Sequence, residues 1–141
     1  MSTLNSVIKD LEQFYNTLSL TLENYRYSLM QDLKSDLPTS VVVNSNFEII
    51  KFEAWAEQYN KALKSLKMLK RAELTETEEL AKTYQILIDV VYDAVSTNSK
   101  NENYKGSILS MSLLTITGRS EACTSLLTLA DSVFKHLMEK K

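Results

Sequence analysis

Apolar residues recur along the chain at intervals of four and three, which is the spacing of one face of an α-helix. The clearest run begins at Leu4 and ends at Leu29. It predicts a first helix over about residues 4–35, because Leu37 precedes Pro38 and a residue before proline is disfavoured in helical geometry. The members of this stripe are Leu4, Ile8, Leu11, Tyr15, Leu18, Leu22, Tyr25 and Leu29.

The segment 37–46 contains a short run of β-branched residues, 41–43, and we expect an extended connector there. Ser45 and Glu48 then fit a capping box, in which a hydroxyl and a carboxylate each bind a free backbone N–H at a helix start. The second helix is therefore expected over about 46–72. Its apolar stripe consists of Phe52, Trp55, Tyr59, Ala62, Leu66 and Leu69.

A second capping box, from Thr75 to Glu78, predicts the start of a third helix over about 76–97. Acidic residues fill its first turn, where the helix dipole favours negative charge. The polar segment 96–105 is expected to form a solvent-exposed loop. The middle of this helix is apolar on nearly all sides, which predicts that it is the most enclosed of the helices; the residues responsible are Ile86, Ile88, Val90 and Tyr92.

The last helical region is expected over about 107–139, with Gly118 as a possible break. Gly118 either caps one helix before another begins at Ser120, or lies inside one continuous helix at a cost of about 1 kcal/mol relative to alanine. The apolar positions keep one phase on both sides of Gly118, which favours the continuous helix. These positions are Leu109, Leu113, Ile116, Cys123, Leu127, Ala130, Phe134 and Leu137.

The fold class that follows is all-α: an elongated bundle of four long helices in a single domain, residues 1–141. A helix of about 30 residues spans about 45 Å, whereas a compact sphere of this chain length would be about 37 Å across. The chain has only two glycines and one proline. This scarcity excludes β folds rich in tight turns and the glycine-rich loops that bind phosphate.

Sixteen basic and eighteen acidic residues give a net charge of -2, so the whole molecule has no field that attracts nucleic acid. One local group of basic residues could contact a phosphate backbone. The alternative is a solvated helix face, with Glu53 and Glu57 in the first half of the second helix and the bases in the second half, as the helix dipole favours. The basic group consists of Lys61, Lys64, Lys67, Lys70 and Arg71.

The sequence contains one histidine and one cysteine, His136 and Cys123. A single histidine excludes metal sites that need two. The two residues are thirteen positions apart on one expected helix, about 20 Å along its axis, so they cannot act together as base and nucleophile. We therefore expect no metal, no cofactor and no enzymatic activity.

The last helical region is unusually poor in charge. Between Ser107 and Ser132 there are ten serines or threonines but only three charged residues. An exposed helix face normally carries charges, so this face is expected to be covered, either by helices of its own bundle or by a partner. The candidate partner interface consists of Ser110, Leu114, Thr117, Ser125 and Leu129.

These observations predict a non-enzymatic helical subunit or adaptor that acts through protein–protein contacts or self-association. The alternative is a small helical subunit of a nucleic-acid-bound assembly that uses the lysine face. Tyr27 lies off the core stripe of the first helix and is a candidate exposed aromatic. No stretch resembles a membrane span or a secretory signal, so an intracellular, cytoplasmic location is expected.

Overall fold

The computed structural model describes residues 3–34, 39–101 and 107–139. These residues form four long helices and confirm the expected all-α bundle. The helices are α1 (Thr3–Lys34), α2 (Thr39–Leu69), α3 (Glu76–Asn101) and α4 (Ser107–Glu139).

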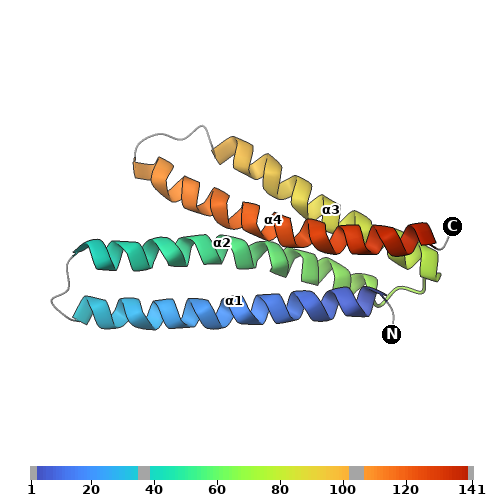
Figure 1. The fold of residues 1–141 in the computed structure, drawn as a ribbon, viewed down its shortest axis with the longest axis horizontal. Helices are drawn as coiled ribbons and strands as arrows, with labels where there is room; N and C mark the ends of the chain where they lie inside the picture. The colour runs from blue at the N-terminus through green and yellow to red at the C-terminus, as the bar shows by residue number, and fades with distance from the viewer. Residues whose placement is uncertain (1–2, 35–38, 102–106, 140–141) are drawn as a thin grey trace.

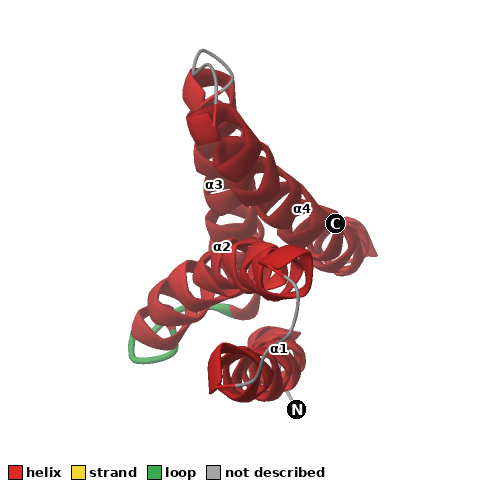
Figure 2. Cartoon of the chain, turned by 90° about the vertical axis from the view of Figure 1, so that its left-hand side faces the viewer, coloured by secondary structure: helices red, strands yellow, loops and turns green. Residues whose placement is uncertain are grey.

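The four helices form two antiparallel hairpins, α1 with α2 and α3 with α4 (Figure 1). The hairpins join where α2 packs along α4, and Figure 2 shows α1 at one edge of the molecule, on the far side of α2 from the other pair. α2 is therefore the central helix. Helices of 26–33 residues are about 40–50 Å long, which accounts for the elongated shape in Figure 1.

All four helices contribute leucine or valine side chains to one hydrophobic core. The stripe predicted on α1 is the stripe that the structure buries, and Leu4, Leu11, Leu18 and Leu22 all belong to the core. Burying one such side chain stabilises the fold by about 1.5–3 kcal/mol. The largest apolar side chains that are fully buried are Leu4, Leu11, Leu66, Leu87, Leu126 and Val133.

The predicted connector over 37–46 is wrong for its greater part, because α2 begins at Thr39 rather than near residue 46. Valine costs a helix only a few tenths of a kcal/mol per residue relative to alanine, so the run 41–43 does not prevent helix formation. Pro38 immediately precedes Thr39, and proline is compatible with a helix start because no backbone N–H is needed there. The capping box at Ser45 therefore lies inside α2.

The start of α3 agrees with the sequence. The backbone N–H of Glu78 donates to Oγ1 of Thr75 at 3.2 Å, which is the hydroxyl half of the predicted capping box. The end of α3 does not agree, because the helix continues to Asn101 and most of the expected loop over 96–105 is helical. Serine and asparagine have low helix propensity, but the penalty per residue is small beside tertiary contacts such as those of Asn98 described below.

The prediction that α3 is the most enclosed helix is also wrong. The Tyr92 side chain remains 73% exposed and Val95 is exposed as well. α3 packs mainly against α4, with fewer contacts to α2, so its outer side faces solvent. α2 takes the enclosed position instead, because it contacts each of the other three helices.

α4 is continuous through Gly118, as the phase of its apolar residues indicates. The buried face of α4 is turned relative to the predicted line: Leu127 and Phe134 are partly exposed, whereas Ala122, Leu126 and Val133 are fully buried. The reason is that α4 packs against two helices, α2 and α3. Phe134, one of the apolar positions predicted for α4, lies on the side of α4 that faces α3, and its ring packs on Tyr84 at 5.6 Å between centroids.

Gly118 lies at a close approach between α2 and α4. A Cβ added at this position would overlap the backbone carbonyl oxygen of Lys51 and lie 3.1 Å from Cβ of Ala54. Gly118 is buried, and a side chain of any size would force the two backbones apart. The glycine is thus neither a helix cap nor a merely tolerated residue, because the packing of α2 against α4 at this position requires that a side chain be absent.

Candidate interaction surfaces

The outer face of α1 carries a row of exposed residues without charge. Six exposed residues follow one another along it at intervals of four, three, four, three and four, and none of them is charged. These residues are Gln13, Thr17, Leu20, Asn24, Tyr27 and Gln31, and we call them the α1 outer stripe.

Two large side chains of the α1 outer stripe extend into solvent: Leu20 is 63% exposed and Tyr27 is 67% exposed. The prediction that Tyr27 is an exposed aromatic is confirmed. A solvent-facing helix surface normally carries a charged residue every turn, yet this stripe has none from Gln13 to Gln31, a length of about 27 Å. Isolated exposed apolar residues need no explanation. A row without charge is a candidate contact surface, because charged residues are depleted from the cores of protein interfaces.

A second charge-poor feature lies between α1 and α4, over the middle of α2. A groove of about 310 Å³ is lined by Phe14, Leu18 and Trp55 together with Thr17, Tyr59 and Ser125. Trp55 donates its indole N–H to the Tyr59 hydroxyl at 2.9 Å, and the Phe14 ring packs on Tyr59 at 5.8 Å between centroids. The groove therefore has an ordered aromatic floor with its polar atoms paired to each other.

The structure places the predicted interface residues of α4 in different surroundings. Thr117 is exposed, and Ser125 is half-buried at the groove. Leu114 is half-buried, and Leu129 is half-buried and packed against the core. The side chain of Ser110 lies outside the residues that are described.

Threonine hydroxyls on the exposed face of α4 bind their own helix. Thr124 Oγ1 donates to the carbonyl oxygen of Ser120 at 3.2 Å, and Thr128 Oγ1 donates to that of Thr124 at 3.0 Å. These bonds satisfy the hydroxyl donors and leave methyl groups on the surface. α4 thus presents a weakly polar outer face although it also packs centrally against α2 and α3.

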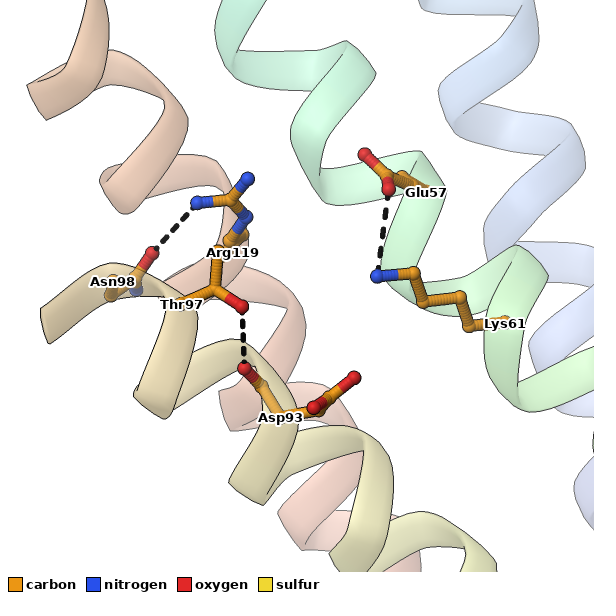
Figure 3. Close-up of polar contacts among 6 residues, drawn as sticks. All are labelled: Glu57, Lys61, Asp93, Thr97, Asn98 and Arg119. Carbon is orange, nitrogen blue, oxygen red and sulfur yellow. Dashed lines mark hydrogen bonds and ion pairs between the residues drawn. The ribbon is translucent and has the colours of Figure 1, made fainter. Parts of the chain in front are cut away.

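The predicted lysine face is divided by the structure. Successive steps of three residues turn each lysine about 60° around α2, and two of the lysines pair with acidic residues. Lys61 Nζ lies 3.5 Å from Glu57 Oε1, as Figure 3 shows, and Lys67 Nζ lies 3.8 Å from Glu12 Oε2 on α1. Arg71 follows the end of α2. The arrangement fits a solvated helix face better than a continuous phosphate-binding surface.

Cys123 and His136 have no common surface. The Cys123 thiol is buried, and desolvation raises its pKa, so the thiol stays protonated at neutral pH. His136 is exposed near the end of α4, with Nδ1 3.8 Å from Glu139 Oε2. Among the residues described, no group of three or more histidines, cysteines or carboxylates is arranged to hold a metal ion. Within the same residues, no helix has the length and apolar character needed to cross a membrane.

A polar clamp between α3 and α4 fixes the segment that contains Gly118. Buried Asn98 donates its amide N–H to the carbonyl oxygen of Ile116 at 3.3 Å and to Ser120 Oγ at 3.4 Å. Its amide oxygen accepts a hydrogen bond from Arg119 at 3.3 Å, drawn in Figure 3. Asn98 therefore satisfies both ends of its amide while it holds α4 against α3.

Gln58 on α2 offers the opposite case. Its side chain is only 1% exposed, and neither its amide nitrogen nor its amide oxygen has a hydrogen-bond partner in the described part of the chain. Burying an amide without partners costs about 1–3 kcal/mol in proteins. The unpaired amide of Gln58 therefore destabilises the fold at α2, the helix that contacts each of the other three.

Replacing Gln58 with leucine is expected to raise the free energy of unfolding by about 1–3 kcal/mol, because the substitution keeps the volume and removes the unpaired amide. Urea denaturation followed by circular dichroism measures the change. The control is Gln85→Leu, at an exposed glutamine that donates to Asp89 at 2.7 Å, where a change within about 0.5 kcal/mol is expected. A loss of stability at position 58 would show instead that the amide is hydrogen-bonded in solution.

Comparisons with protein-family models, curated proteins and solved structures found no match to this chain. Function must therefore be inferred from the surfaces described above. The α1 outer stripe was not predicted from the sequence as a site, although Tyr27 was predicted to be an exposed aromatic. The signal that could have found it is the run of uncharged positions at helical spacing on the side of α1 opposite the apolar stripe.

Proposed function

We propose that this chain is a non-enzymatic helical subunit or adaptor that works through protein–protein contacts. The observation that carries the proposal is the α1 outer stripe, an exposed row of six uncharged residues that includes Leu20 and Tyr27. Desolvating charged side chains opposes association, whereas uncharged and apolar positions can be buried by a partner at little cost.

Two further features support protein contact. The groove at Trp55 and the outer face of α4 are both poor in charge, and they lie on helices adjacent to or near α1. The reading as a nucleic-acid-bound subunit has weaker support, because Lys61 and Lys67 already pair with Glu57 and Glu12. Specific phosphate recognition also favours arginine, and the basic group contains only Arg71.

The proposal is tested in cell extract. The tagged chain is expected to elute at a mass well above that of its monomer, and the double variant Leu20→Lys, Tyr27→Lys is expected to elute at a lower mass. An ammonium group on the α1 outer stripe would have to lose its water on association, which costs several kcal/mol when it has no partner. Size-exclusion chromatography with light scattering gives both masses.

The matched control is Met68→Lys with Tyr92→Lys. These side chains are 72% and 73% exposed, so they resemble Leu20 and Tyr27 in exposure but lie on other helices. The control variant is expected to behave as the unmodified chain does. If the unmodified chain is monomeric in extract, or if both double variants reduce the mass equally, the proposal fails.

A further inference from the structure

The connection between the two hairpins consists of residues that favour a helix. α2 ends at Leu69 and α3 begins at Glu76, so residues 70–75 carry the chain from one hairpin to the other, as the green loop in Figure 2 shows. Lysine, arginine, alanine, glutamate and leucine are among the residue types with the highest helix propensity, and they fill positions 70–74. The connection contains neither glycine nor proline. Residues 70–74 therefore do not by themselves impose a turn.

An unbroken helix through the connection would keep the buried faces of α2 and α3 on one line. Leu66 and Leu80 are both buried and lie fourteen positions apart, which is two heptads. Tyr59 and Leu87, one heptad further out on either side, are buried as well. A straight helix drifts from this repeat by about 20° per heptad, which is small beside an apolar stripe about 100° wide. The two helices can therefore join without turning either buried face toward solvent.

Such a helix would separate the two hairpins of one chain, and a second copy can supply the contacts that are lost. If two chains both open at residues 70–75, the α1–α2 hairpin of each packs on the α3–α4 hairpin of the other. The contacts between hairpins are then made again between chains, including the approach of Gly118 to Lys51 and Ala54. Exchange of identical elements is a low-cost route to a dimer for this reason.

The packing between the hairpins contains an unpaired polar group that lowers the cost of separating them. Gln58 follows Ala54 by one helical turn, so it lies on the side of α2 that meets α4. Its buried amide has no hydrogen-bond partner in the described part of the chain. Separation of the hairpins would expose this amide to water, which supplies the missing bonds. The opened chain is therefore easier to reach than it would be with an apolar residue at position 58.

Two features of the connection favour the closed chain. Thr75 caps α3, because its Oγ1 accepts a hydrogen bond from the N–H of Glu78 at 3.2 Å and its carbonyl oxygen accepts one from the N–H of Glu79 at 2.9 Å. The acidic residues in the first turn of α3 gain from the dipole of a separate helix, and in an exchanged pair they would approach those of the second copy. The closed monomer therefore prevails at low concentration, and exchange is favoured at high concentration.

From these observations we propose that residues 70–75 are a hinge at which two copies of this chain exchange hairpins, with residues 39–101 of each copy forming one helix. A helix of that length spans about 95 Å, so the exchanged dimer is about twice as long as the monomer. The proposal goes beyond the proposed function, because it uses the packed faces between the hairpins and does not involve the α1 outer stripe.

The first test is refolding of the purified chain from urea at about 1 µM and at about 1 mM. Refolding at the higher concentration is expected to give a dimer that persists after dilution, because return to the monomer requires the hairpins to separate. Size-exclusion chromatography with light scattering measures the dimer fraction, and small-angle X-ray scattering measures its length. A chain that stays monomeric, a dimer that dissociates as soon as it is diluted, or a dimer no longer than the monomer overturns the proposal.

The second test strengthens the continuous helix. Thr75→Ala removes the cap from the closed chain only, and each dimer contains two chains. The dissociation constant is therefore expected to fall by on the order of 10- to 100-fold. Thr77→Ala is the matched control, because Thr77 is an exposed threonine that is helical in both forms, and it is expected to leave the dissociation constant nearly unchanged. Equal effects of the two substitutions would overturn the hinge.

The third test breaks the continuous helix. Proline is compatible with the first position of α3 but interrupts a helix that runs through it, so Glu76→Pro is expected to remain a folded monomer at about 1 mM. Its circular dichroism spectrum checks the fold, and Thr75→Ala decides the question if this variant does not fold. A folded Glu76→Pro chain that dimerises as the unmodified chain does would overturn the proposal. So would loss of the dimer in the double variant Leu20→Lys, Tyr27→Lys, which changes the α1 outer stripe alone.

Discussion

Replacing Leu66 with alanine is expected to lower the free energy of unfolding by about 2–5 kcal/mol, the range for deleting a fully buried leucine side chain. Leu66 has no exposed surface and lies on α2, the helix that contacts each of the other three. The substitution would therefore leave a cavity among packed helices that can move little to fill it. Urea denaturation monitored by circular dichroism measures the loss.

Met68→Ala is the control for Leu66→Ala. Met68 lies two residues away on the same helix and its side chain is mostly exposed, so a change within about 0.5 kcal/mol is expected. Similar losses at the two positions would contradict the assignment of α2 as the central helix. A loss below about 1 kcal/mol at position 66 would contradict the core itself.

Gly118→Ala is expected to destabilise the fold by about 1–3 kcal/mol, although alanine is the better helix former by about 1 kcal/mol. The reason is steric: the added Cβ would overlap the carbonyl oxygen of Lys51, and a backbone atom cannot move aside as a flexible side chain does. Thermal or urea unfolding measures the change, with exposed Thr124→Ala as the control on the same helix.

The sign of the stability change caused by Gly118→Ala distinguishes two explanations for a glycine at this position. If Gly118 were only a residue tolerated inside a long helix, alanine would stabilise the protein by its higher propensity. If the α2–α4 approach requires a missing side chain, alanine destabilises it. A measured gain in stability would therefore mean that α2 and α4 are further apart in solution than they are in this structure.

The fold was predictable where the helical period alone decides the structure. The stripe from Leu4 to Leu29 and the cap at Thr75 lie where the sequence indicates, because both depend on neighbours within a few residues. The start of α2 at Thr39 was not predictable from local signals. Valine prefers strands but costs a helix little, and proline is compatible with a helix start, so the local sequence does not decide between a connector and a helix.

The candidate site was predictable only in part, because surface exposure depends on how the helices are arranged. Tyr27 was found from its displacement off the core stripe, and Thr117 from the lack of charge on α4. Leu129 was included in the candidate partner interface, and the structure packs it against the core because α4 has two neighbours and a wide buried face. The number of neighbours of a helix is a property of the whole fold.

The junction at Gly118 also has a consequence for the order of folding. Within each hairpin the contacting helices are consecutive along the chain, whereas Lys51 and Gly118 are 67 positions apart. Contacts between distant positions close long loops and cost more chain entropy, so short-range structure tends to form first. Docking of two preformed hairpins is thus the expected final step, and Gly118→Ala should accelerate unfolding while leaving the folding rate nearly unchanged, as stopped-flow kinetics would reveal.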